Sequence, residues 1–444
     1  MDDRGENTGK PGFPIPLPVW SASRSQQRLG DGATGLPHTP AGWGASRSNQ
    51  RLGNGETGFP HPPELCGAAA QASDTIGAMQ PRRIAIDASR ISVAERTGTE
   101  RYTFELLAAL ARIDRWNTYT LYTNGLPPSL PPVGPNFSLR SIRLPRLWTH
   151  ARLGPALMRD RPDLLFVPAH VIPLLHPRSV VTIHDLGYLA FPEAHTARRR
   201  LELDLSTRWC LRAAHRVIAI SQATKNDLVR HYGADPARIV VVHLGRSNLF
   251  RPPDDPGQIA AIRARYALEA PYFLYIGTIQ PRKNLTRLIE AFARAGADDA
   301  LLVIAGRRGW LSEPIVRRVA ELGLTNRVRF PGYVPDADLP ALLSGALAFV
   351  FPSLHEGFGM PVLEAMACGA PVLTSTTSAL PEVAGDAALL VDPCDTDAIA
   401  AALKRLAADA PLRASLRARG WERAANFTWE RCARETLDAL LGCL

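Results

Sequence analysis

The sequence predicts an α/β protein with two doubly wound, Rossmann-like domains that face a cleft. From residue 82 onward, short runs rich in β-branched residues alternate with segments that carry apolar residues at helical spacing. Such alternation indicates parallel sheets covered by helices on both faces. The stretch Leu249–Asp255 (LFRPPDD) interrupts the pattern and divides it into two similar halves. We therefore predict domains at residues 79–248 and 249–426, with ligands beyond the carboxyl ends of their strands.

Composition narrows the class of protein. The chain has 444 residues, 46% hydrophobic content and a formal net charge of +9, which fits a protein that handles anionic nucleotides or rests against an acidic lipid surface. Nucleic acid is a poor partner, because no compact Lys/Arg run is interleaved with aromatic residues. No uninterrupted apolar run reaches about 18 residues, so we predict no transmembrane helix.

The six cysteines form no C-x-x-C pair and no Cys/His cluster with zinc spacing. Scattered cysteines of this kind fit a reducing compartment, and the N-terminus lacks the basic start and apolar core of a secretory signal. We expect a cytoplasmic protein. Peripheral contact with the inner face of the membrane is an option that the net charge leaves open.

Residues 1–78 differ from the rest of the chain. They are rich in Gly, Pro, Ser and Arg, and the segment Ala22–Gly30 returns almost unchanged as Ala45–Gly53. Such a composition cannot bury enough apolar surface to offset the entropy lost on ordering. We predict that translation begins at Met79 and that the upstream part is a misassigned extension. The alternative is a disordered tail that binds a partner.

The first half contains seven predicted strands, with Phe104–Ala111 (FELLAALA) as its clearest helix. The predicted strands are Ile84–Asp87, Thr118–Thr123, Leu139–Leu144, Leu164–Pro168, Val180–His184, Val217–Ser221 and Ile239–His243.

The second half contains six predicted strands, with helices that include Leu285–Ala295 and Asp338–Leu343. The final segment, Phe427–Leu440, has the periodicity of an amphipathic helix. The predicted strands are Phe273–Gly277, Leu301–Ala305, Val328–Phe330, Ala346–Phe351, Pro371–Thr374 and Ala388–Val391.

One segment of the second half carries the strongest functional signal. Between the strand that ends at Phe351 and a predicted helix at Pro361–Cys368 lie two glycines and the carboxylate of Glu356. Backbone N–H groups at a helix N-terminus attract anions, whereas a carboxylate accepts hydrogen bonds from sugar hydroxyls. Glu356 and Glu364 on either side of such a cradle therefore suggest a nucleotide-sugar site.

Two cations follow the first strand of the second half. The string begins at Gly277 and continues Thr-Ile-Gln-Pro-Arg282-Lys283-Asn284. We predict that Asn284 is the N-cap of a helix at Leu285–Phe292, which puts both cations at a helix N-terminus. Arginine can bind a phosphate through two hydrogen bonds, and lysine acts as a point charge. The alternative is a pair of solvated surface cations.

Two other strand ends carry polar residues. His184 can hydrogen-bond a sugar hydroxyl, with a structural role as the alternative, and Asp185 is expected to cap the following turn. Asp336-Ala-Asp338 matches the D-x-D pattern of metal-dependent transferases, but we predict no metal there. Asp338 is better explained as the N-cap of Leu339–Leu343, and Asp336 as a turn residue.

These strings together resemble one family. Glu356-Gly-Phe-Gly-Met-Pro-Val-Leu-Glu364 strongly resembles the E-x7-E signature of retaining glycosyltransferases of family 4, which have the GT-B fold. The string from Gly277 is similar to the family's G-x-x-x-P-R-K-N phosphate loop, although some relatives carry an arginine where this chain has Thr278. The resemblance covers roughly residues 82–440.

Two motifs of the first half extend the resemblance. Thr-Ile-His184-Asp-Leu resembles the family's histidine motif. The segment from Arg96 to Tyr102 loosely resembles its glycine-containing first loop, from which Gly98 is carried over. The resemblance also implies that a helix formed by residues 427–444 crosses back onto the first domain.

The resemblance implies a role for each candidate residue. Glu356 would hold the hydroxyls of the transferred sugar and Glu364 those of the ribose, while His184 would orient donor or acceptor. Arg282 and Lys283, with backbone N–H groups of the cradle, would stabilise the departing diphosphate. The implied catalytic residues are Glu356, His184, Arg282 and Lys283. The implied donor-binding residues are Glu364, Gly357, Phe358, Gly359, Met360, Pro361, Gly98, Gly277, Val334 and Tyr333.

The resemblance further implies a reaction without a protein nucleophile, in which the leaving phosphate deprotonates the acceptor. GDP-mannose is the first choice of donor, no metal or cofactor is required, and the acceptor is a hydroxyl of a glycan or lipid-linked glycan. A GT-B nucleotide-sugar epimerase, a sugar phosphorylase and a non-catalytic partner subunit are the alternatives.

Overall fold

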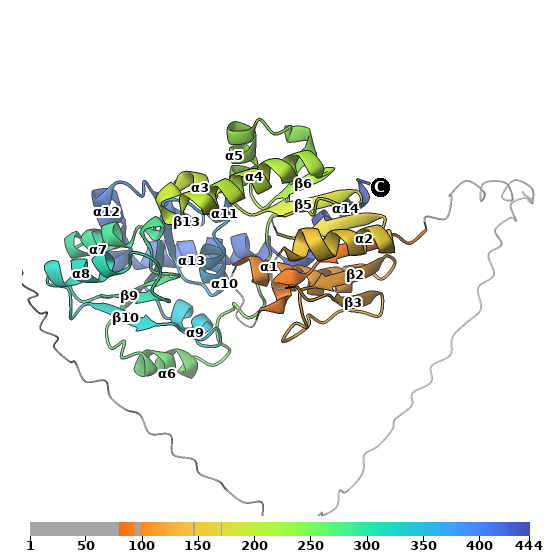
Figure 1. The fold of residues 1–444 in the computed structure, drawn as a ribbon. Coiled ribbons are helices and arrows are strands. Elements are labelled where there is room, and N and C mark those ends of the chain that lie inside the picture. Colours follow the sequence, from red (N-terminus) through yellow and green to blue (C-terminus); the bar gives the residue numbers. More distant parts are fainter. Residues whose placement is uncertain (1–79, 94–97, 145–146, 170) are drawn as a thin grey trace, which may run out of the picture. The chain divides into compact units, whose positions relative to one another are not determined.

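A computed structural model of the chain describes residues 80–444, apart from residues 94–97, 145–146 and 170 (Figure 1). The predictions for the tail, residues 1–78, and for a start at Met79 lie outside the described residues. The predicted fold class is confirmed, because the described strands form two parallel sheets with helices in the connections between strands. In Figure 1 the strands of the first sheet are orange to yellow-green, and those of the second sheet are teal to blue.

The first sheet has seven parallel strands in the described part of the chain, in the order β3-β2-β1-β4-β5-β6-β7. Its register puts Ile86 beside Leu121 and Phe166 of the neighbouring strands. The strands are β1 (Arg83–Asp87), β2 (Thr118–Thr123), β3 (Phe137–Ser141), β4 (Leu164–Val167), β5 (Ser179–Ile183), β6 (Arg216–Ala219) and β7 (Ile239–Val241).

All seven predicted strands of this half are present, and β2 begins and ends at the predicted residues. β3 was misplaced, because it begins two residues before the predicted range Leu139–Leu144 and ends three residues before its end. β3 is an edge strand whose side chains are exposed or half-buried. Its apolar pattern is therefore a weak guide to its position.

The second sheet has six parallel strands in the order β10-β9-β8-β11-β12-β13, again counted over the described residues. Phe349 pairs with Val372 on one side and with Leu274 on the other. The strands are β8 (Tyr272–Ile276), β9 (Leu301–Ala305), β10 (Val328–Gly332), β11 (Ala348–Phe351), β12 (Val372–Ser375) and β13 (Ala388–Val391). β9 and β13 match the predicted ranges residue for residue, and the other four overlap them.

Helices cover the two sheets. Those of the first half are α1 (Gly98–Ile113), α2 (Gly154–Asp160), α3 (Gly187–Ala190), α4 (Ala197–Ala213) and α5 (Gln222–Tyr232). Those of the second half are α6 (Gly257–Arg265), α7 (Leu285–Arg294), α8 (Glu313–Glu321), α9 (Leu339–Ser344), α10 (Met360–Ala367), α11 (Leu380–Ala384), α12 (Thr396–Ala408), α13 (Ala410–Ala425) and α14 (Trp429–Leu441).

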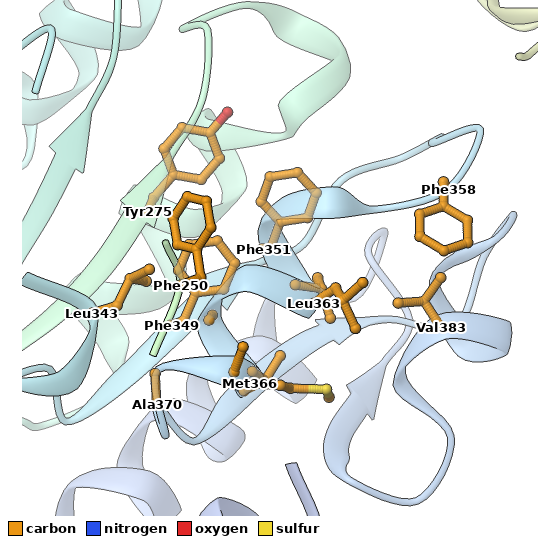
Figure 2. Close-up of a cluster of buried hydrophobic side chains, with 14 of the residues drawn as sticks. Phe250, Tyr275, Leu343, Phe349, Phe351, Phe358, Leu363, Met366, Ala370 and Val383 are labelled. Atoms are coloured by element: carbon orange, nitrogen blue, oxygen red, sulfur yellow. The ribbon is translucent and has the colours of Figure 1, made fainter. Parts of the chain in front are cut away.

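Aromatic packing fixes the interior strand β11. The rings of Phe349 and Phe351 lie 5.7 Å apart between centroids, and Tyr275 of β8 stacks on Phe351 at the same distance (Figure 2). All three side chains are fully buried, and burying a side chain of this size contributes roughly 1.5–3 kcal/mol. The loop that carries Glu356 leaves the carboxyl end of this strand, so the packing sets its starting point.

The C-terminal helix returns to the first domain, as the resemblance implied. α14 packs along α1, and Arg112 of α1 donates to the Glu430 carboxylate at 2.6 Å. Just before α14, the Phe427 carbonyl accepts from the Arg246 N–H at 3.0 Å. The Thr428 hydroxyl caps the helix by accepting from the Arg431 N–H at 3.1 Å. None of the described helices combines the length and apolarity needed to cross a bilayer.

Candidate active site at the strand ends

Three loops of the second domain are joined at the carboxyl ends of their strands. The Ile279 N–H, after β8, donates to the Arg307 carbonyl at 2.9 Å, and the Gly309 N–H donates back to Ile279 at 2.9 Å. The Gly306 N–H, after β9, donates to Gly332 of β10 at 2.7 Å. These bonds make the loops after neighbouring strands one continuous layer. Candidate residues separated by more than fifty positions in the sequence therefore share one surface.

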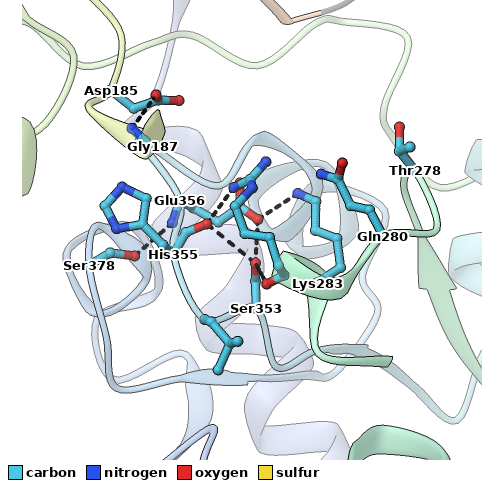
Figure 3. A network of polar contacts seen from close by, with 12 residues as sticks. Asp185, Gly187, Thr278, Gln280, Lys283, Ser353, His355, Glu356 and Ser378 are labelled. Carbon is cyan, nitrogen blue, oxygen red and sulfur yellow. Dashed lines mark hydrogen bonds and ion pairs between the residues drawn. The ribbon is translucent and has the colours of Figure 1, made fainter. Parts of the chain in front are cut away.

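Glu356 is the centre of a buried polar cluster (Figure 3). Its carboxylate accepts from the Lys283 ammonium at 2.5 Å and from the Ser353 hydroxyl at 2.5 Å, and it lies 3.1 Å from the Arg282 guanidinium. Burial alone would raise the pKa of Glu356, but Lys283 and Arg282 lower that pKa to about 2. Glu356 is therefore an ionised, buried carboxylate at neutral pH.

The two cations belong to the same cluster. Lys283 is 8% exposed, and its ammonium lies 4.8 Å from the centroid of the Phe351 ring. Burial lowers the pKa of Lys283, and Glu356 opposes this shift. Arg282 also donates to the His355 carbonyl. The alternative of two solvated surface cations is wrong for this pair, since both are bound to a buried acid.

The N-cap prediction for Asn284 is right in position, because this residue directly precedes α7, but its side chain makes no capping hydrogen bond. Its backbone has a φ of 61°, a left-handed conformation that asparagine tolerates, and its amide donates to the carbonyls of Pro352 and Pro393. The residue therefore ties the loop after β8 to two other loops. Arg282 and Lys283 lie in a short 3₁₀ turn, Pro281–Lys283, rather than in α7 itself.

The predicted phosphate cradle lies at the start of α10. Gly359 precedes the helix with a φ of 113°, which disfavours any residue with a side chain. Pro361 lies in the first turn, where its missing N–H costs nothing. The first N–H groups of a helix have no partner within the helix, so those of Gly359 and Met360 suit an anion. Phe358 is buried, with its ring 6.0 Å from that of His243, so it offers a ligand only its backbone.

Gly357 allows the two domains to touch. A Cβ atom at this position would lie 2.3 Å from the His184 carbonyl oxygen of the first domain, closer than any real contact. That carbonyl also accepts from the Thr224 hydroxyl at 3.2 Å. The glycine in the E-x7-E string therefore permits a backbone contact between domains, which sequence analysis did not anticipate.

His184 follows β5 and is half-buried. Its Nε2 lies 2.9 Å from the Pro168 carbonyl, which can only accept, so Nε2 carries the proton. Burial lowers the pKa of His184, and the ring packs edge-on against Tyr102 at 4.9 Å. A neutral ring with Nδ1 as its acceptor can receive a hydrogen bond from a sugar hydroxyl. Asp185 caps the next turn as predicted, accepting from the Gly187 N–H at 2.9 Å.

Glu364 lies on α10, and its partner comes from the other domain. Arg101 of α1 donates to the Glu364 carboxylate at 3.2 Å and also binds Asp336. Burial, opposed by Arg101, raises the pKa of Glu364 to about 7. Arg101 was missed, although it stands beside Tyr102 in the first-loop string from which only Gly98 was selected. Gly98 begins α1, one turn before Arg101.

The remaining donor-site candidates lie along the same edge. Gly277 follows β8, and its N–H donates to the Ala305 carbonyl at 3.0 Å. Tyr333 is 58% exposed, with the Arg307 guanidinium 4.9 Å from its ring centroid, and Val334 is buried. A ligand at this edge could therefore contact the exposed ring of Tyr333, but only the backbone of Val334.

The N-cap prediction for Asp338 is also right in position only. Asp338 precedes α9 but makes no side-chain capping bond. Its carboxylate accepts from Arg265 at 2.8 Å and from Tyr266 at 2.7 Å. Within the described ranges, no group of three or more His, Cys, Asp and Glu side chains is arranged to hold a metal ion.

A cavity of about 450 Å³ opens between the domains beside the Glu356 cluster. Its lining includes His184 and Thr99 of the first domain, and Arg282, Gln280 and Trp310 of the second. The Trp310 indole donates to the Gln280 side chain at 3.1 Å. Trp310 was not found from the sequence, because only the loop contacts between β8 and β9 bring it here. The volume is sufficient for a small ligand such as a sugar.

Two protein-family models match the chain. "Glycosyltransferase Family 4" matches residues 96–246, and "Glycosyl transferases group 1" matches residues 259–423. The chain is 35% identical to O-antigen chain mannosyltransferase B of Escherichia coli over 295 residues, which are 65% of this chain and 77% of that protein. The chain belongs to the family 4 glycosyltransferases.

Other similar proteins agree with this assignment. A D-inositol 3-phosphate glycosyltransferase of Streptomyces bingchenggensis is 31% identical over 411 residues, 81% of this chain and 89% of that protein. The crystal structure of HepE from Anabaena in complex with UDP-glucose superimposes with a TM-score of 0.64 at 18% identity, covering 81% of this chain and 99% of that chain. At this identity the likeness shows the fold alone, which is the GT-B arrangement of two Rossmann-like domains.

If Arg282 and Lys283 hold the diphosphate of the donor, Lys283→Ala will weaken nucleoside diphosphate binding by about 10- to 100-fold, the usual effect of one charge-assisted contact. Binding of the monophosphate will weaken less. Lys283→Arg will not restore affinity, because a planar guanidinium does not replace a buried point charge. Calorimetry with GDP and GMP measures both effects. Lys404→Ala, an exposed lysine of α12, is the matched control. Equal GDP affinity of wild type and Lys283→Ala would remove this loop from the donor site.

Proposed function

We propose that this glycosyltransferase moves a sugar, with mannose as the first choice, from a nucleoside diphosphate to an acceptor hydroxyl, with retention of configuration and without a metal ion. The carrying observation is the cluster of an ionised Glu356 with Arg282 and Lys283, beside the second acid Glu364. The mannosyltransferase name of the Escherichia coli relative supports the choice of sugar. The acceptor is proposed to be a glycan or a lipid-linked glycan.

In this proposal the positive groups serve the leaving diphosphate. Arg282 and Lys283, with the N–H groups of Gly359 and Met360, surround the point where negative charge develops as the glycosidic bond to phosphate breaks. Preorganised donors of this kind usually contribute more to catalysis than any other single effect. The leaving phosphate oxygen takes the proton of the acceptor hydroxyl. Glu356 accepts hydrogen bonds from the sugar's hydroxyls while sharing its two cations with the diphosphate.

GDP is the proposed nucleotide. Tyr333 and Val334 form the loop that meets the base in the family, and Asp336 follows two residues later with a half-exposed carboxylate. A carboxylate can accept two hydrogen bonds from guanine, through its N1–H and its N2 amino group, but only one from the single N–H of uracil. His184, neutral with Nδ1 as acceptor, is proposed to orient the sugar or the acceptor from the first domain.

Replacing the central acid tests this proposal. Glu356→Gln keeps the shape of the side chain but not its charge, and we expect turnover with GDP-mannose to fall by at least about 100-fold. Product formation, followed with a panel of GDP-, UDP- and ADP-sugars, also identifies the donor. Glu193→Gln, in the exposed turn before α4, is the control. Full activity of a folded Glu356→Gln variant would contradict the assignment.

The proposal predicts that activity survives chelation. Two cations of the chain and the α10 N-terminus supply the positive charge that a metal would otherwise bring to the diphosphate. Turnover in EDTA, compared with turnover in added Mg²⁺ or Mn²⁺, should differ by less than about twofold. Complete loss on chelation, restored by a divalent cation, would assign the diphosphate to a metal instead.

We also propose that α4 rests on an anionic membrane surface. Arg198, Leu201, Leu205, Arg208 and Arg212 recur every three or four residues and so share one face of this helix. Leu201 is 59% exposed and Leu205 is 57% exposed. The helix carries five arginines against two acidic residues, a balance that suits acidic lipid headgroups. His195, just before the helix, and Leu203, within it, line the cavity, so a lipid-linked acceptor would reach it.

Sedimentation with phospholipid vesicles tests this surface. Wild type should bind vesicles with about one third phosphatidylglycerol and release them at high salt, and Leu201→Ser/Leu205→Ser should bind several-fold less. Leu311→Ser, a 59% exposed leucine of the second domain, is the control. Equal binding by wild type and the double variant, or no binding by wild type, would contradict the proposal.

A further inference from the structure

Arg101 is the residue through which the first domain reaches the donor site of the second. It lies in the first turn of α1. One guanidinium nitrogen donates to Glu364 at 3.2 Å, and the other binds the Asp336 carboxylate. The guanidinium also lies 5.9 Å from the ring centroid of Phe250, in the segment that joins the domains. Arg101 thus contacts α10, the loop after β10 and the connection between domains.

The two acids of the E-x7-E string are held in different ways. Glu356 binds Lys283, Arg282 and Ser353, all from its own domain. For Glu364, Arg101 is the one side chain that hydrogen-bonds it within the described ranges. Arg101 uses one carboxylate oxygen of Glu364, whereas a carboxylate can accept about four hydrogen bonds. No side chain of the described residues donates to the other oxygen, which can therefore accept from a ligand.

We propose that Arg101 is a positioning residue of the donor site: from the first domain it holds Glu364 as an ionised acceptor for the ribose hydroxyls of the nucleotide. This inference rests on the proposed function, in which Glu364 binds the ribose. It adds that the second acid is competent only while the two domains are together. Donor binding therefore depends on a residue outside the nucleotide-binding domain.

The surroundings of Glu364 explain why it needs this partner. Burial raises its pKa, the nearby Asp336 carboxylate raises it further, and Arg101 lowers it, with a result of about 7. Burial and the charge of Glu364 also raise the pKa of Cys368, one turn further along the chain, so this thiol stays neutral at neutral pH. Without Arg101, burial and the Asp336 carboxylate both disfavour the charged form, so Glu364 would be protonated at neutral pH. A neutral carboxyl is a weaker acceptor than a carboxylate.

The direction of the pH effect follows from this pKa. An acid whose pKa is raised is neutral below that pKa and ionised above it. Loss of Arg101 raises the pKa further, so the variant should bind nucleotide poorly at neutral pH and recover as the pH rises. A contact that merely stabilised the fold would weaken binding equally at every pH.

The test is calorimetry of GDP binding to the full chain at pH 6, 7, 8 and 9, with each variant expressed as a ratio to wild type at the same pH. The ratio cancels the titration of GDP itself. Arg101→Gln should bind about 10-fold or more weakly at pH 7, as for loss of a charge-assisted contact, and within about threefold of wild type at pH 9. The GDP affinity of Arg101→Lys at pH 7 should lie between those of wild type and Arg101→Gln. Arg112 lies on the same helix as Arg101 and forms an exposed ion pair with Glu430 of α14. Arg112→Gln, the control, should match wild type at every pH.

Glu364→Gln distinguishes a failure of this inference from a failure of the ribose assignment, because it cannot ionise. It should bind GDP weakly at all four pH values, and adding Arg101→Gln should then have no pH-dependent effect. A ratio for Arg101→Gln that is constant with pH would overturn the inference alone. Tighter binding by Arg101→Gln would also overturn it, because Arg101 would then compete with the ribose. Unchanged GDP affinity in Glu364→Gln would overturn the ribose assignment, and the inference with it.

Discussion

A buried carboxylate in the loop after β11, that of Glu356, is the constraint around which the proposed donor site is built. An unpaired buried charge is strongly unfavourable, and removing one partner from a buried pair typically costs about 3–5 kcal/mol. Glu356 therefore requires Lys283 and Arg282, which lie in the loop after β8. The amide of Asn284 fixes this loop by donating to the Pro352 carbonyl after β11. The carboxylate and the two cations fix one another. The cations are consequently preorganised at the strand ends before any nucleotide is present.

The same edge of the second sheet is where the two domains meet. Gly357 lies against the His184 carbonyl, and Glu382 of α11 accepts from the Gln222 N–H at 2.7 Å at the start of α5. His243, in the connection after β7, binds the same carboxylate at 2.6 Å. Arg101 adds a contact at the proposed nucleotide site. The two halves thus touch through several groups on this edge.

The fold was predictable from the sequence because parallel strands buried on both faces are short, continuous apolar runs. That signal fails at β3, an edge strand with exposed side chains. The site was predictable only in part. Adjacent residues such as Arg282 and Lys283 were found as a pair, but their partner Glu356 lies more than seventy positions away. Asn284 and Asp338 are N-cap residues as predicted, but their side chains bond to distant partners instead of capping the helix. Arg101 could not be assigned to Glu364, since that contact exists only when two domains are juxtaposed.

A crystal structure with GDP bound at neutral pH would show whether the cations of the Glu356 cluster and the two acids of the E-x7-E string together form the donor site. We predict phosphate oxygens within hydrogen-bond distance of Lys283, Arg282 and the α10 N-terminus, and ribose hydroxyls on Glu364 with Arg101 still in contact. A diphosphate bound away from Lys283 and Arg282, with both cations still held by Glu356 alone, would contradict this arrangement of the donor site.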